Sequence, residues 1–116
     1  MPQTELEGPY SLNSETIDSV VAKTSPGVYV LGYVGIGGFF IPKHVGRSDD
    51  SISDRLKDCV GGKYSKFKFD YYDSPEAAFA KECCLYHDWK EQLDNDQHPD
   101  RPENTRCRCP ECDVFK

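Results

Sequence analysis

Polar residues with side chains suited to proton transfer, anion binding or metal binding recur between apolar segments of the 116-residue chain: Tyr29, His44, Arg55, Glu82 and Asn95. A guanidinium such as that of Arg55 pairs with two phosphate oxygens and stays charged at neutral pH. His44 can exchange a proton near neutral pH. Glu82 falls in an apolar helical stripe, where a carboxylate is costly unless it meets a cation. A divalent ion or an ion pair with Arg55 would supply that cation.

A second group of candidates contains cysteines near the C-terminus. Cys109-Pro110-Glu111-Cys112 has the spacing at which two thiolates hold one tetrahedral Zn²⁺. Cys84 and His87, on the last predicted helix, complete a Cys₃His set that would attach the tail to that helix. Alternative ligands are His98, Cys107 and Cys83. The other interpretation is free thiols packed as small apolar groups, and Cys59 fits such a core position.

The first half of the chain predicts a short helix followed by a hairpin. Residues up to 13 are polar and read as a loose arm, and residues 14–23 form a helix capped by Asn13 or Ser14. The segments 28–34 and 39–45 are rich in β-branched and aromatic residues, and the link between them is rich in glycine, which predicts an antiparallel hairpin. Pro42 lacks an amide donor and therefore predicts an edge or a bulge in the second strand.

The second half predicts a helix, a strand and a longer helix. Apolar residues one turn apart indicate a helix over 52–60, and Gly61-Gly62 ends it. Aromatic and charged residues alternate over 64–71, which is typical of a strand with one buried face. Ser74-Pro75-Glu76 is a strong start for a helix over 75–90. The element pattern therefore predicts an α+β fold.

The ordered set Gly27-Val28-Tyr29, His44-Val45-Gly46, Arg55, Glu82 and Asn95 resembles the GIY-YIG nuclease family. The resemblance spans about Pro26 to Asn95. It departs from the family pattern because the second motif begins with histidine instead of tyrosine and lies further from the first. It implies a small three-stranded antiparallel sheet flanked by helices. The implied divisions are an arm and helix over 1–24, a nuclease domain over 25–95, and a Cys-rich tail over 96–116 packed on that domain.

The resemblance also implies a role for each motif residue. Tyr29 would activate or orient the attacking water, and His44 would share the base role. Arg55 would contact the scissile phosphate, and Glu82 would bind a catalytic Mg²⁺ or Mn²⁺ ion. Asn95 matches an asparagine that follows the metal-binding helix. Arg47 stands near the phosphate position, and Gly46 lets the backbone approach the ligand closely, so the implied phosphate-binding residues are Gly46, Arg47 and Arg55.

The charge distribution bears on a DNA partner. The net charge is −6, but seven basic and four acidic residues between positions 43 and 68 leave this window at +3, while seven basic and sixteen acidic residues leave the remainder at −9. A basic face on an acidic body would suit DNA, because cations displace counterions from phosphates. The alternative is that lysine and aspartate alternate on solvated surfaces.

Two functions remain open from the sequence. One is a metal-dependent DNA endonuclease, acting as a homodimer or with a partner protein that supplies specificity. The other is a catalytically inactive module that binds nucleic acid or protein and carries a structural zinc site. Because neither a secretory signal nor a membrane-length apolar run is visible, we expect a cytoplasmic protein, in which its six cysteines favour metal binding over disulfides.

Overall fold

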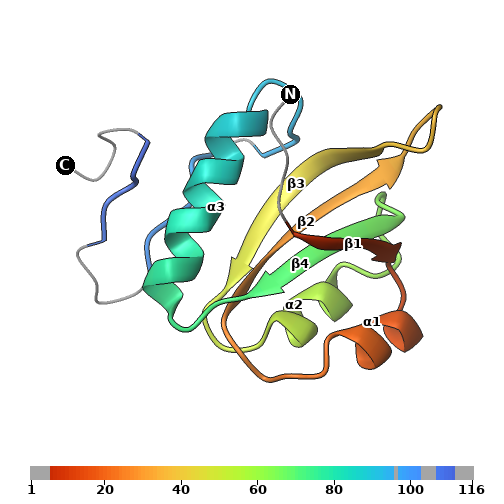
Figure 1. Cartoon of the computed structure of the whole chain (residues 1–116), viewed down its shortest axis with the longest axis horizontal. Helices are drawn as coiled ribbons and strands as arrows, with labels where there is room; N and C mark the ends of the chain where they lie inside the picture. Colours follow the sequence, from red (N-terminus) through yellow and green to blue (C-terminus); the bar gives the residue numbers. More distant parts are fainter. Residues whose placement is uncertain (1–5, 96, 103–106, 112–116) are drawn as a thin grey trace.

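The computed structural model describes residues 6–95, 97–102 and 107–111. This described part contains an antiparallel sheet with the strand order β1-β4-β2-β3, together with three helices. The elements are β1 (Glu7–Ser11), α1 (Ser14–Val20), β2 (Gly27–Val34), β3 (Phe40–Ser48), α2 (Ile52–Asp58), β4 (Lys66–Tyr71) and α3 (Pro75–Trp89). Helix α3 lies against one face of the sheet, and α1 and α2 lie at the other (Figure 1). None of the helices in these residues has the length and apolar character that crossing a membrane requires.

The α+β class is confirmed, but the expected three-stranded sheet has a fourth strand. Strand β1, in the segment predicted to be a loose arm, pairs with β4 at the sheet edge opposite β3. The ring of Tyr10 packs on Phe67 and Phe69, with centroid distances of 5.7 and 6.0 Å. The pairing shifts register between Glu7 and Tyr10. Because of this irregularity, β1 lacks the regular alternation of apolar and polar residues from which a strand is predicted.

The hairpin and its irregularity are confirmed. Strands β2 and β3 pair in antiparallel register with Tyr29 opposite Gly46, and β3 is an edge strand. The register shifts where Leu31 pairs with His44 and Gly32 with Pro42, so the bulge lies beside the proline. The predicted caps are also present, because Asn13 accepts from the Thr16 amide and Ser74 from the Ala77 amide.

Strand β2 is buried on both faces and separates two hydrophobic cores. Tyr29 and Leu31 face α1 and α2, in a core that also contains Leu12, Ile17, Val21, Ile52, Leu56, Phe67 and Phe69. Val28 and Val30 face α3, in a core with Leu6, Val45, Ala78 and Leu85. Tyr29 of β2 therefore points to the face of the sheet that α1 and α2 cover, whereas α3, which carries Glu82, packs on the opposite face.

Candidate functional site

Tyr29 is a buried phenol that lies across Gly46 of the neighbouring edge strand. Its side chain is 3% exposed. A Cβ atom built on Gly46 would overlap Cζ, Cε2 and Oη of Tyr29. Gly46 is therefore required for the tyrosine to occupy this place, which is a packing reason beside the ligand approach expected from the sequence.

Gly46→Ala is expected to destabilise the fold by about 1–3 kcal/mol, because the added methyl group must displace a buried ring. The same substitution in a Tyr29→Leu background should cost less, since the overlapping atoms are gone. Urea denaturation of the native chain, the two single variants and the double variant measures this coupling. Equal costs of Gly46→Ala in both backgrounds would show that the ring does not constrain this position.

Arg55 and Cys59, both from α2 and its C-terminal end, are the polar neighbours of the Tyr29 hydroxyl. Arg55 is exposed to solvent, and its guanidinium is close enough to that hydroxyl to lower its pKa. The Cys59 thiol donates to the Arg55 carbonyl over 3.3 Å. The packing of Ile52 and Leu56 into the core fixes the helix, so that Arg55 presents a cation at the surface beside a buried phenol.

Burial and, to a smaller extent, Cys59 raise the pKa of Tyr29 to about 12, although Arg55 opposes the shift. The phenol is thus protonated at neutral pH. It can donate a hydrogen bond and orient a water molecule, but without a further cation it is a weak base.

The pH dependence of stability tests this environment. A folded-state pKa above the unfolded value of 10.0 means that the contribution of Tyr29 to stability is fully present below pH 10 and is lost as the pH rises toward about 12. The unfolding free energy of the native chain should therefore fall relative to Tyr29→Phe above pH 10, as urea denaturation at stepped pH values would measure. Parallel pH profiles of the two proteins would contradict the raised pKa.

Glu82, on α3, forms an ion pair with Arg47 of β3 instead of Arg55. Nη1 of Arg47 lies 2.8 Å from Oε1 of Glu82, and Nε lies 2.6 Å from Oδ1 of Asp49. The guanidinium also stands 5.3 Å from the centre of the Phe79 ring. Burial raises the pKa of Glu82 to about 7, although Arg47 opposes the shift. The cation expected for the buried carboxylate is thus present, and it is the residue that directly follows the second motif.

His44, on β3, packs against Tyr64. Their ring centroids are 6.2 Å apart, and the Tyr64 hydroxyl donates to Asp94 over 2.7 Å. Burial lowers the pKa of His44, and the nearby charges of Arg55 and Lys63 lower it while that of Asp94 raises it. His44 is therefore a neutral imidazole at pH 7, and it can accept a proton.

Asn95 fastens the C-terminal chain to the edge strand. Its Oδ1 accepts from the Val45 amide over 2.9 Å, and its Nδ2 donates to the Val45 carbonyl over 3.0 Å. This paired contact satisfies outward-facing backbone groups of β3 next to Gly46. Asn95 therefore positions the second motif, and its amide is engaged in doing so.

The motif residues fall into two groups on either side of edge strand β3. Tyr29, Arg55 and His44 belong to the side that α2 covers, and Arg47 pairs with Glu82 on the side that α3 covers. The two groups are close enough for the charge of Glu82 to act on Tyr29, and for that of Arg55 to act on Glu82.

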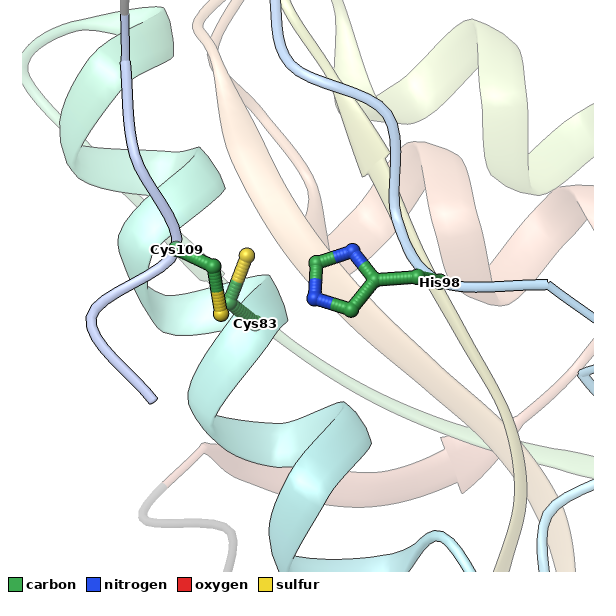
Figure 2. A group of neighbouring side chains, drawn as sticks. All are labelled: Cys83, His98 and Cys109. Carbon is green, nitrogen blue, oxygen red and sulfur yellow. The ribbon is translucent and has the colours of Figure 1, made fainter. Parts of the chain in front are cut away.

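A separate cluster that could hold a metal ion joins α3 to the C-terminal segment. The ligand atoms of Cys83, His98 and Cys109 all lie within 4.8 Å of one another. Figure 2 shows the Cys83 and Cys109 side chains next to each other, with the His98 ring directed toward them. Burial and the neighbouring Cys109 raise the pKa of the Cys83 thiol, so that a cation would be needed to hold it as thiolate.

The residues of this cluster differ from the predicted ligand set. Cys83 takes the place of Cys84, because the C-terminal segment returns over the face of α3 that carries Phe79 and Cys83. His98, an alternative in the sequence, is a member, whereas Cys107 only packs against the cluster. Cys112 lies outside the described residues.

The sequence missed two features of the candidate site. One is the pairing of Arg47 with Glu82, which the position of Arg47 two residues beyond Val45 on the same strand face could have indicated. The other is Asp94, which lies within 3.9 Å of Lys43 and 3.3 Å of Lys63 as well as bonding to Tyr64. No local pattern marks Asp94.

Comparisons of the chain with protein-family models, curated proteins and solved structures found no match.

Proposed function

We propose that the chain is a metal-dependent DNA endonuclease that hydrolyses phosphodiester bonds by GIY-YIG-type chemistry. The observation that carries the proposal is the buried Tyr29 phenol, whose pKa the exposed Arg55 guanidinium lowers and on which the charge of Glu82 also acts. These are the side chains that the motif resemblance assigns to the reaction, and they come from three separate elements.

Each residue has a role that its environment supports. The exposed Arg55 fork binds the scissile phosphate and neutralises charge in the transition state. Tyr29, protonated at neutral pH, orients the attacking water by its hydroxyl group. Neutral His44 accepts the proton of that water. Lys63 and Arg55 both act electrostatically on His44, so this end of the sheet offers cations to a DNA backbone.

Glu82 fits a hard divalent ion such as Mg²⁺ or Mn²⁺. Mg²⁺ is commonly bound by one or two carboxylates, waters and substrate phosphates. Glu82 is the buried carboxylate of this site, and because its pKa is about 7, a proton competes with the ion at neutral pH and ion binding strengthens above it. The ion would polarise the phosphate and assist the leaving oxygen. For the ion to bind Glu82, Arg47 must release its ion pair with Glu82 while it keeps its ion pair with Asp49.

That Arg47 contact favours the second candidate function, an inactive module that binds nucleic acid or protein. An ion pair of 2.8 Å already satisfies the buried carboxylate, so a metal ion must compete with a guanidinium. In the module, Arg47 and Glu82 are structural partners, and Arg55 and Lys63 contact phosphates without hydrolysis.

Incubation of the purified chain with supercoiled plasmid separates the two functions. We expect nicked and linear products with Mg²⁺ or Mn²⁺ and intact plasmid when the ion is omitted. Omission is preferable to a chelator, because a chelator would also remove an ion from the cysteine cluster. Retarded plasmid without cleavage, over a range of either ion, would support the module and reject the nuclease.

For the cysteine cluster we propose Zn²⁺ as a structural ion, distinct from the catalytic one. Thiolate and imidazole ligands suit Zn²⁺, whereas Mg²⁺ prefers oxygen.

A further inference from the structure

Beside the three clustered ligands stands a second histidine, His87, one helical turn after Cys83 on α3. Its Nε2 lies 3.3 Å from Nε2 of His98 and 3.5 Å from Sγ of Cys109. With zinc bond lengths of about 2.0–2.1 Å to nitrogen and about 2.3 Å to sulfur, the edges of a tetrahedron are about 3.3–3.4 Å between two nitrogens and about 3.6 Å between nitrogen and sulfur. These two separations match those edges, although His87 lies outside the group whose ligand atoms are all within 4.8 Å of one another.

The hydrogen bond on the far side of His98 supports the same arrangement. Nδ1 of His98 lies 2.8 Å from the Pro99 carbonyl, so this nitrogen donates its proton and Nε2 carries a lone pair. A metal-binding histidine is commonly oriented by such a bond to a backbone carbonyl. The lone pair of His98 then faces His87 and the two thiols, where a cation would bind it.

We propose that Cys83, His87, His98 and Cys109 form a closed tetrahedral Zn²⁺ site that clamps the C-terminal segment onto α3. Four protein ligands leave no open position, so the ion is structural. Two thiolates and two neutral imidazoles balance the charge of Zn²⁺, which suits a half-buried site. This inference does not depend on nuclease activity.

The clamp would also hold a segment that contacts the candidate active site. Two residues after His98, the Asp100 carbonyl accepts from Nη1 of Arg47 over 2.6 Å. That same nitrogen contacts Glu82. Phe79, which packs with Cys83 and Cys109, lies under the Arg47 guanidinium. Zinc binding therefore fixes two neighbours of Arg47.

Zinc X-ray absorption of the native full-length chain tests the ligand set without any substitution. We expect one zinc per chain with two sulfur and two nitrogen neighbours, and an intense tetrahedral visible spectrum when Co²⁺ replaces it. A shell with three sulfurs would place a further cysteine in the set and overturn it. A six-coordinate shell of oxygen and nitrogen, or a chain that binds no zinc, would also overturn it.

A pair of matched variants then tests His87 itself. His87→Ala should weaken zinc binding by about 100-fold in a competition titration, as the loss of one of four ligands implies. Cys84→Ser, which removes the thiol next to Cys83 in sequence, should bind zinc as the native chain does. Equal affinity of His87→Ala and Cys84→Ser would remove His87 from the site. If His87→Ala does not fold, the nitrogen count of the native shell still decides between one histidine and two.

Discussion

Glu82→Gln is expected to lower plasmid cleavage by about 10³-fold while the chain stays folded. The glutamine side chain keeps the shape of the carboxylate and can still accept the hydrogen bond from Nη1 of Arg47. It lacks the negative charge that would bind Mg²⁺, and a metal ion contributes several kcal/mol to such a reaction, on the order of 10³-fold in rate. Initial rates of plasmid nicking at saturating Mg²⁺ measure the effect.

The matched control is Glu91→Gln, which removes an exposed acid just beyond the end of α3 and should leave cleavage unchanged. Circular dichroism and zinc content must also match the native chain, because Glu82 adjoins Cys83. Thermal stability at pH 8 should be equal or higher in Glu82→Gln, since a neutral amide avoids the desolvation that raises the pKa of the buried acid. Native-like cleavage by this variant would exclude Glu82 as the metal ligand.

The sequence predicts most elements because local signals coincide there. The glycine-rich link joins two runs of β-branched residues, and Asn13 and Ser74 cap the helices that follow them. Strand β1 is not predicted from the sequence because its residues include Gly8 and Pro9 and its partner, β4, is distant in sequence. Aromatic contacts of Tyr10 with β4, rather than intrinsic strand propensity, hold it in the sheet.

The sequence predicts the residue types of the candidate site, but it predicts less well which of these residues contact one another. Periodicity places Glu82 on a buried face of α3, but it cannot show that Arg47, reaching across from β3, is closer than Arg55. Likewise, the sequence places Cys84 in the ligand set and leaves Cys83 as an alternative. The choice between them depends on the path of the segment after residue 96, which long-range packing on Phe79 determines.

Arg55→Ala is expected to lower cleavage by about 10²- to 10³-fold, the cost of removing one electrostatic contact to a reacting centre. Stability should change by only about 0.5 kcal/mol, because Arg55 is exposed. Arg55→Lys should recover part of the rate, since an ammonium keeps the charge but loses the two-pronged contact with phosphate oxygens. Nicking rates and urea denaturation of the same preparations separate the two effects.

Lys57→Ala is the control that makes this test specific. Lys57 lies on the same helix and is exposed, and its pair with Asp18, at 2.5 Å, is a surface contact worth little. Both variants lose one positive charge from α2, so general attraction to DNA falls equally. Of these two residues, Arg55 is the one that acts on Tyr29. Because Arg55 lowers the pKa of the Tyr29 phenol, Arg55→Ala should also raise that pKa. If the two variants lose activity to the same extent, Arg55 acts as one cation of a basic surface and not as the phosphate ligand of an active site.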